Sequence, residues 1–340
     1  MESGAQPGAR PTGARISWTD VAKAAAGVVL VVALIQWGHI DFGALGNLLG
    51  SPAALLACGV LVVTMIPLGA LRWAVLLRAF ELHLPFSRVF HYFSVGMVLN
   101  LFMLGTVGGD SLRTLLAWRA LGRDGAKVAI SVAGDRIAGL LALMTLALSA
   151  LAYNWRWAQS VVALAALGTL LALAYLVLLG GILAVAVMPA LVERVAQPLS
   201  RWPRLAPLIQ QIRDVAFAVR SRPGALLAVF ALALLVQSLG VLAVLVIAAT
   251  IDIGRLTTAD YLFAVPVSFV ANALPLTPNG LGVGEATFDQ ICRWLEPVPS
   301  GAAYSSIFFA FRAVSMLGVL CGLVSFVIPQ RDLPVDEART

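Results

Sequence analysis

Long, unbroken runs of apolar residues alternate with short polar stretches along this chain. The continuous runs cover about 19–37, 53–79, 128–152, 159–187, 224–249 and 302–328. An α-helix rises about 1.5 Å per residue, so about 20 apolar residues are enough to cross a hydrocarbon core about 30 Å thick. The pattern therefore predicts six helices that cross a membrane fully.

Two further apolar stretches, at about 88–108 and 260–279, are interrupted by Gly or Pro, and a short amphipathic piece follows each of them. Non-helical backbone at membrane depth is tolerated only where protein or a water-filled cavity satisfies its polar groups. We therefore expect 88–122 and 259–297 to form two re-entrant hairpins. The alternative is that either segment crosses the membrane fully with its amphipathic partner.

The basic residues set the expected orientation. Most of the 23 Lys and Arg lie in the N-terminal region, between the second and third runs, at 188–223 and near the C-terminus. The alternate loops contain only Arg156, Arg255 and Arg293. Cytoplasmic loops carry an excess of Lys and Arg, so we expect both termini to be cytoplasmic. The two hairpins then enter from opposite faces of the membrane.

Residues 53–152 and 224–328 follow the same order of span, interrupted stretch and span. The first break runs from Asn100 to Asp110, and the second from Asn272 to Glu285. Each begins with Asn, passes through Gly and ends in a carboxylate that opens the next helix. Because one unit would start outside and the other inside, we predict an inverted repeat. Broken helices in inverted repeats are typical of transporters that alternate access.

Composition supports the membrane prediction. Apolar residues make up 60% of the 340 positions and charged residues only 12%, and the mean hydropathy is +0.93. Soluble domains carry about 25% charged residues, so a soluble globule is excluded, and a disordered chain is excluded by the high hydrophobicity. The predicted class is an all-α polytopic membrane protein. Its expected parts are a disordered cytoplasmic tail at 1–17, one transmembrane domain at 18–328 with a cytoplasmic amphipathic linker at 189–222, and a cytoplasmic tail at 329–340.

Cysteine and histidine suggest no metal chemistry. The three cysteines are far apart, and the three histidines have no ligand spacing. No nucleic-acid motif accompanies the net charge of +6, which fits cytoplasmic loops that face anionic lipid. We expect no cofactor, no metal and no nucleic-acid partner.

The two breaks are the candidate functional site. After each break a helix begins, and its first N–H groups have no intrahelical partner and carry the positive end of the helix dipole. Two such ends in one cavity would suit an anion such as a lipid phosphate. Charged residues inside membrane spans are costly and favour a function. The candidate substrate-binding residues are Gly108, Gly109, Asp110, Arg113, Asp135, Arg136, Pro278, Asn279, Gly280, Gly282, Glu285 and Arg312.

A structural role is the alternative for these charged residues. They would then form salt bridges that lock the hairpins onto neighbouring spans. For Arg72 and Asp289 the two interpretations are equally weighted, because long charged side chains also reach the membrane surface by snorkelling. The Gly and Pro clusters would, in the same interpretation, be ordinary kinks or loops.

The motifs also resemble a known family. In order they are Gly108-Gly109-Asp110 with Arg113, then Asp135-Arg136, then Pro278-x-Gly280-x-Gly282-x-x-Glu285. This order resembles the signature of the lysylphosphatidylglycerol synthase transmembrane family, the flippase-like domain of bacterial multiple peptide resistance factors. The resemblance covers about residues 50–328. It implies a bacterial inner-membrane protein that moves aminoacylated phosphatidylglycerol from the inner to the outer leaflet.

We expect a stand-alone member of that family, without the aminoacyl-transferase domain. Asn279 and Gly284 depart from the family pattern, so the headgroup stays open among a phospholipid, an aminoacyl-phospholipid, a hopanoid and a polyprenyl-linked lipid. The expected function is lipid translocation. The alternatives are an intramembrane lipid-modifying enzyme, for which the breaks offer no clear nucleophile, and a non-catalytic partner of such an enzyme. A lipid-modifying enzyme and a second copy of the chain are the candidate protein partners.

Overall fold

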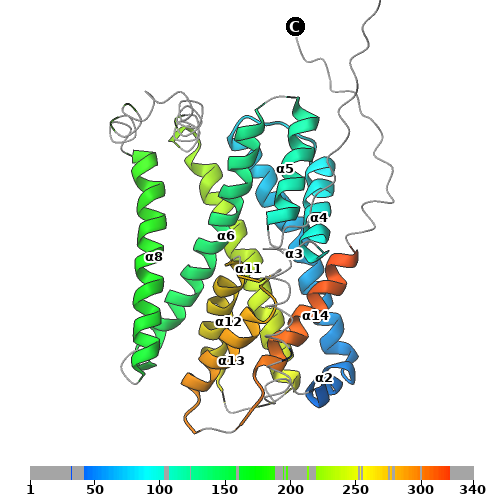
Figure 1. The fold of residues 1–340 in the computed structure, drawn as a ribbon, viewed down its shortest axis with the longest axis vertical. Coiled ribbons are helices and arrows are strands. Elements are labelled where there is room, and N and C mark those ends of the chain that lie inside the picture. The colour runs from blue at the N-terminus through cyan, green and yellow to red at the C-terminus, as the bar shows by residue number, and fades with distance from the viewer. Residues whose placement is uncertain are drawn as a thin grey trace, which may run out of the picture.

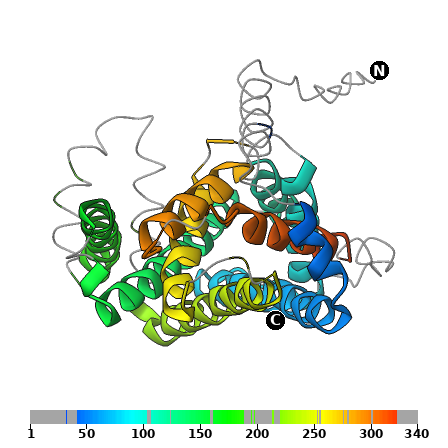
Figure 2. The ribbon, with the colours of Figure 1, turned by 90° about the horizontal axis from the view of Figure 1, so that it is seen from below.

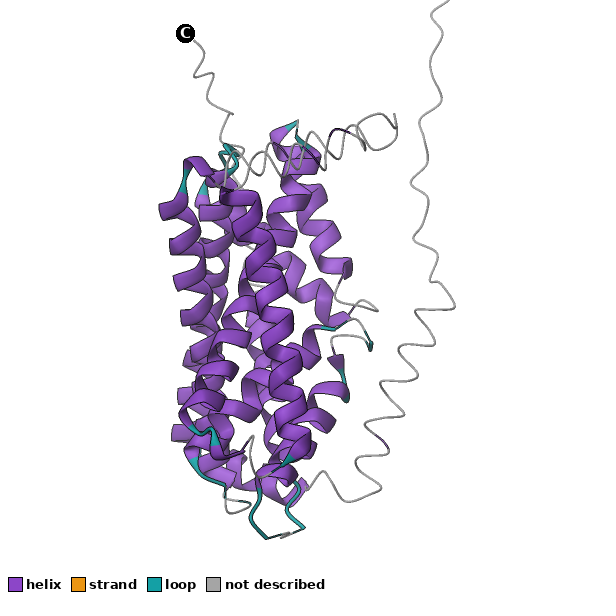
Figure 3. Cartoon of the chain, turned by 90° about the vertical axis from the view of Figure 1, so that its left-hand side faces the viewer, coloured by secondary structure: helices purple, strands orange, loops and turns teal. Residues whose placement is uncertain are grey.

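A computed structural model of the chain is α-helical throughout the part that it describes (Figure 3). The structure describes residues 32, 42–102, 107–122, 124–157, 161–187, 194, 197, 213, 220–251, 253, 256–274, 276–277, 280–298 and 301–321. The predicted all-α class is therefore confirmed. The two predicted tails, and most of the predicted linker at 189–222, lie outside the described residues.

Four of the described helices are long and apolar enough to cross a membrane. They are α3 (Pro52–Ala79), α6 (Gly125–Tyr153), α8 (Val162–Val187) and α11 (Pro223–Ile251). Each corresponds to a predicted apolar run, and the ends agree within three residues. The chain is a multi-pass membrane protein.

The other two predicted spans are covered in part. The run at 19–37 lies outside the described residues except for residue 32. The run at 302–328 is described as far as residue 321 and forms α14 (Ser305–Cys321), which has 17 residues. The six-span topology therefore stays a prediction.

Both interrupted stretches consist of two shorter helices that pack against each other. The first gives α4 (Phe86–Phe102) and α5 (Val107–Leu121), which we call the upper helix pair. The second gives α12 (Thr258–Ala273) and α13 (Val283–Leu295), the lower helix pair. The upper pair occupies the upper half of the molecule and the lower pair the lower half (Figure 1). The positions of both breaks were predicted correctly.

One helix was not predicted. The segment between the first two predicted runs contains the short helix α2 (Phe42–Leu49). This segment has eight residues, and no apolar run long enough to cross a membrane marks it. It packs against α3, α11 and α14 at the lower end of the bundle (Figure 1).

The two long helices α3 and α11 pack side by side and join the two halves (Figure 2). The upper half has its own apolar core, in which Trp73 of α3 and Val89 of α4 are almost fully buried. The larger core lies in the lower half, where Phe263, Phe288 and Phe308 come from α12, α13 and α14. Each helix pair is thus held by a separate core against the same long helices.

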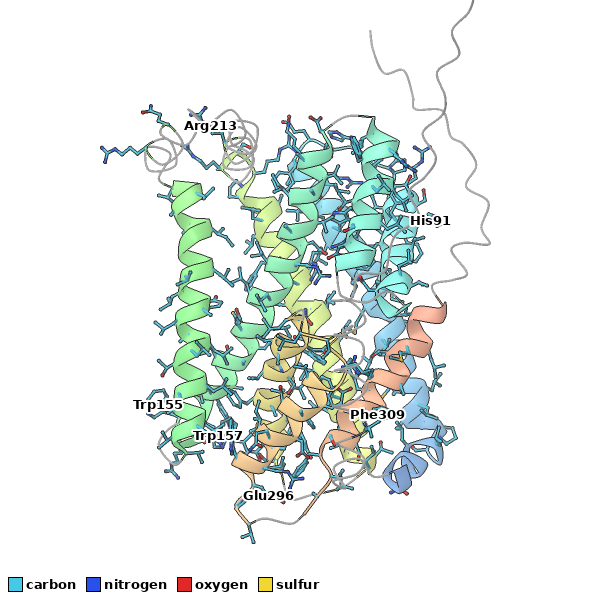
Figure 4. All side chains as sticks on the ribbon, viewed as in Figure 1. His91, Trp155, Trp157, Arg213, Glu296 and Phe309 are labelled. Carbon is cyan, nitrogen blue, oxygen red and sulfur yellow. The ribbon has the colours of Figure 1, made fainter. Side chains whose placement is uncertain are left out.

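Helix α8 lies at the rim of the bundle, beside α6 (Figure 2). It is apolar around its whole circumference, and Leu170, Leu176 and Val177 are exposed on it. Such a helix is suited to contact lipid tails on most of its surface. Trp155 and Trp157 lie where α6 leads into α8, at the lower end of both helices (Figure 4).

Candidate functional site

Charged side chains from three helices meet in the upper half of the molecule. Asp110 and Arg113 lie one turn apart at the start of α5, because the break before this helix places Asp110 in its first turn. Asp135 and Arg136 come from α6, and Arg72 comes from α3. We call these five residues the upper ionic cluster.

Asp135 is the central acceptor of the upper ionic cluster. Its Oδ1 accepts a hydrogen bond from Arg72 Nε at 2.6 Å, and its Oδ2 accepts one from Arg113 Nη1 at 3.2 Å. Arg113 Nε lies 3.0 Å from Asp110 Oδ1. Arg136 Nε donates to Asp110 Oδ2. A chain of ion pairs therefore ties α5 to both α3 and α6.

The upper ionic cluster is buried on one side and exposed on the other. Arg72, Arg113 and Asp135 are buried. The guanidinium carbon of Arg113 lies 5.1 Å from the ring centre of Trp73, a distance at which a cation and an aromatic face attract each other. The side chain of Arg136 is 40% exposed. A ligand could thus reach the cluster from the side of Arg136 while its core stays desolvated.

A second cluster lies in the lower half and joins α12, α13 and α14. Arg312 Nη2 donates to Glu285 Oε2 at 3.1 Å, to Asn272 Oδ1 at 2.9 Å and to the carbonyl oxygen of Gly280 at 3.2 Å. Arg312 Nε also donates to Glu285 Oε1. We call Asn272, Glu285 and Arg312 the lower ionic cluster. Glu285 is fully buried, so its charge is balanced by Arg312 in a low-dielectric environment.

Glu285 also holds the start of its own helix. Its Oε2 accepts a hydrogen bond from the backbone N–H of Gly282 at 2.9 Å, just before α13 begins. A carboxylate at this position satisfies one of the free N–H groups and is favoured by the helix dipole. The same carboxylate therefore binds Arg312 and holds the start of α13.

Glycine is required at both breaks for reasons of space and conformation. A Cβ atom on Gly109 would lie 1.9 Å from the carbonyl oxygen of Gly96, and one on Gly280 would lie 1.9 Å from Asn272 Oδ1. Gly280 and Gly282 also have φ values of +67° and +79°, which other residues rarely adopt. These close approaches bring the second helix of each pair against the end of the first.

An asparagine completes each break. Asn100, in the last turn of α4, accepts a hydrogen bond from the backbone N–H of Gly109 at 2.9 Å. Asn272, in the last turn of α12, accepts one from Arg312. The two halves thus use the same kinds of groups: an asparagine that ends one helix, a carboxylate that opens the next, and an arginine from the helix that follows.

A cavity of about 260 Å³ lies between α4, α12 and α14, and it is lined by residues of both halves. Its polar lining comes from both break asparagines, Asn100 and Asn272, and from Arg312 and Ser315 on one face of α14. The Oγ atom of Ser315 is buried and has no hydrogen-bond partner among the described residues. The remaining lining side chains are apolar: Met97, Phe269, Phe308, Phe311, Met316 and Val319.

The structure places the predicted residues in two groups. Asp110, Arg113, Asp135 and Arg136 come together in the upper ionic cluster, and Gly280, Gly282, Glu285 and Arg312 come together around the lower one. Gly109 contacts Asn100, whereas Gly108 lies beside it in the first turn of α5. Pro278 and Asn279 lie outside the described residues.

Arg72 and Asp289, for which the sequence favoured neither a functional nor a structural role, have different surroundings in the structure. Arg72 belongs to the upper ionic cluster through Asp135. Asp289 pairs instead with Arg293 one turn further along α13, at 2.6 Å. Glu285 and Asp289 lie one turn apart on α13, but only Glu285 pairs with Arg312.

Asn100, Asn272 and Ser315 are absent from the predicted set of site residues. The sequence contains one signal for the asparagines, because each stands first in its break. Ser315 offers no such signal, since a serine inside an apolar span is common and cheap. Among the described residues, no group of three or more His, Cys, Asp or Glu could hold a metal ion.

Comparison with known proteins gives one match. The family model described as the lysylphosphatidylglycerol synthase TM region matches residues 23–322. This range includes both helix pairs and both ionic clusters. No curated protein and no solved structure matches the chain.

Proposed function

Since the chain belongs to the family of the lysylphosphatidylglycerol synthase TM region, with a role that concerns membrane lipids, we propose that it translocates a phosphate-bearing lipid between leaflets. The lipid headgroup would pass through the cavity between the two helix pairs. The single observation that carries the proposal is this cavity, to which both broken helices contribute an asparagine and α14 contributes Arg312.

The proposed topology has six full crossings and two re-entrant hairpins. The upper and lower helix pairs would enter the membrane from opposite faces and end near its middle. Their positions in opposite halves of the bundle support this arrangement (Figure 1). Both termini would be cytoplasmic, as the distribution of Lys and Arg favours.

The corresponding contacts of the two halves support the inverted repeat. In the first half the carboxylate of Asp110 pairs with Arg136, and in the second half that of Glu285 pairs with Arg312. In each case the arginine lies on the helix after the pair, so equivalent positions carry equivalent groups. Such a repeat would let one half open while the other stays closed.

Arg312 and the helix N-termini would bind the phosphate. The guanidinium group can offer a planar pair of N–H donors to a phosphate, as it now does to Glu285. The positive ends of α5 and α13 add to the favourable potential. A phosphate that competes with Glu285 for Arg312 would loosen the lower break, and a similar exchange at Asp110 would loosen the upper one.

Reconstituted vesicles test the proposal. The purified chain is placed in liposomes that contain a fluorescent phosphatidylglycerol, and transfer between leaflets is followed by quenching of the outer leaflet with dithionite. We expect Glu285→Gln to lower the rate by about tenfold to a hundredfold, because a charge-assisted hydrogen bond contributes about 1.5–3 kcal/mol.

Glu296→Gln is the matched control. Glu296 follows α13 at the lower end of the molecule and accepts a hydrogen bond from Tyr304, away from the cavity (Figure 4). We expect this variant to retain the rate of the native chain. If the native chain transfers lipid no faster than protein-free liposomes, the proposed function is wrong.

A further inference from the structure

One nitrogen of Arg72 is buried and finds no hydrogen-bond partner in the part of the chain that the structure describes. Arg72 is 8% exposed and lies in α3, and its Nε is used by Asp135. Its Nη1 has no acceptor among the described residues. A buried charged donor that lacks an acceptor costs more free energy than a neutral one. A native protein therefore rarely leaves such a group without an ion or a water.

Three guanidinium groups share the two carboxylates of the upper ionic cluster. Asp135 is shared between Arg72 and Arg113, and Arg113 shares Asp110 with Arg136. Arg72 and Arg113 are both buried and share Asp135, and the outer nitrogen Nη1 of Arg72 has no acceptor among the described residues. By contrast, the lower ionic cluster has one arginine and one carboxylate.

The side-chain amide of Gln237 and the guanidinium group of Arg72 both approach Gly139. A Cβ atom built on Gly139 of α6 would lie 3.5 Å from Arg72 Nη1, 3.9 Å from Arg72 Nη2 and 3.3 Å from Gln237 Nε2 of α11. Gln237 Nε2 donates to the carbonyl oxygen of Gly139 at 3.5 Å, which is the longest distance for a hydrogen bond and leaves its other N–H available. The missing side chain at Gly139 lets these nitrogens converge.

We propose that Arg72 and Gln237 bind an anion beside Gly139, at the contact of α3, α6 and α11. Chloride and the oxygen atoms of a phosphate group are the anions that a guanidinium and an amide N–H can bind. The anion would accept a hydrogen bond from the unsatisfied Nη1 of Arg72 and join the first long helix of one half to that of the other. This site is separate from the cavity, and it can exist whether or not the chain translocates lipid.

Thermal unfolding of the full chain in a phosphate-free neutral detergent tests the proposal. The chain is titrated with sodium chloride, with sodium gluconate added to keep the ionic strength constant. We expect a saturable rise of a few degrees in the unfolding midpoint, because a ligand that binds only the native state stabilises it. A second series in gluconate, with phosphatidylglycerol added to the micelles, asks whether a lipid phosphate has the same effect.

Gln237→Glu is the decisive variant. It places a carboxylate beside Arg72 Nη1 without altering an ion pair of the cluster, so it should raise the midpoint in gluconate and remove the response to both anions. Gly139→Ala should weaken the response at least tenfold in anion concentration, because the added Cβ would lie 3.3 Å from Gln237 Nε2 and 3.5 Å from Arg72 Nη1 and would hinder an anion from reaching both. Gln290→Glu, which is exposed on α13, is the matched control and should respond like the native chain.

The outcomes separate the anion sources and the alternatives. Saturation by chloride identifies a free anion, and a response to phosphatidylglycerol alone identifies a lipid phosphate. Equal midpoints in chloride, gluconate and added lipid would overturn the proposal, because Arg72 Nη1 would then be satisfied without an anion. An anion response that persists in Gln237→Glu would overturn it as well.

Discussion

Arg312 and Arg113 show how single residues can be both structural and functional in a membrane. Each guanidinium group is buried and paired with a carboxylate, so the cost of placing its charge at membrane depth is offset locally. The same pairing holds a helix start in place, because Glu285 and Asp110 open α13 and α5. The structural and the functional interpretations of these residues are therefore compatible.

Gly109 provides a test at this scale. Gly109→Ala places a Cβ atom 1.9 Å from the carbonyl oxygen of Gly96, so the backbone of α4 or α5 has to move. We expect a loss of about 1–3 kcal/mol in stability, as for other overpacked sites. Thermal unfolding of the purified variant measures the change.

Gly59→Ala is the control for this substitution. Gly59 also lies inside a helix, α3, but a Cβ atom there meets no atom within 4 Å. Alanine is the better helix former, so this variant should match or slightly exceed the stability of the native chain. Equal losses in both variants would show that the contact between Gly96 and Gly109 is not the cause.

At the scale of elements, the two helix pairs are the unusual feature of the fold. Helices of 15 and 17 residues in the upper pair, and of 13 and 16 residues in the lower pair, are too short to cross a hydrocarbon core alone. Each pair packs internally and shares a core with the long helices. The proposed re-entrant arrangement would account for these lengths, because a pair that turns back needs only half the depth of the membrane.

Thiol labelling tests the topology. Single cysteines are placed at Ser87 and Arg119, the exposed outer ends of the upper pair, and at Thr258 and Val298, the outer ends of the lower pair. The three native cysteines are replaced first. In intact cells, a membrane-impermeant maleimide should label the lower two positions and spare the upper two.

Two ends of one pair on different sides of the membrane would contradict the hairpins. Such a result would mean that this pair crosses the membrane fully. The reagent applied to opened membranes, where all four positions should react, controls for burial of the introduced thiols.

At the scale of the whole molecule, the proposed function needs the two halves to open in turn. Each half has its own ionic cluster, which would close it in this proposal, and Ser315 lines the cavity between the helix pairs. A change that weakens only one cluster should shift the population toward the state in which that half is open. The cavity would then become accessible from one side and less accessible from the other.

A cysteine at position 315 reports this shift. In the Ser315→Cys background, Glu285→Gln should speed labelling from the side of the lower helix pair and slow it from the other side. Asp110→Asn should have the opposite effect. Rates that change in the same direction in both variants would contradict alternating access. Labelling of each variant in detergent, where both sides are accessible, controls for differences in the reactivity of the thiol itself.

Much of the fold follows from local properties of the chain. The four described spans were predicted because runs of apolar residues longer than about 20 have one favourable environment. The breaks were predicted because each apolar half-helix ends in an asparagine, Asn100 or Asn272, and a glycine, Gly109 or Gly280, follows it before the next helix. Helix α2 was not predicted, because its eight residues have no pattern that distinguishes them from a loop.

The partners of the charged residues could not be predicted in the same way. The sequence by itself determined that the chain spans a membrane, where its helices break and which charged residues stand beside the breaks, because these depend on hydropathy and on neighbouring residues. Only the tertiary structure decided that Arg72 pairs with Asp135 across 63 positions, that Asp289 turns away from Arg312, and that Gln237 approaches Gly139 across 98 positions. These contacts arise from the packing of α3, α6 and α11 and from that of α13 and α14, and the energy of this packing is distributed over many side chains far apart in the sequence.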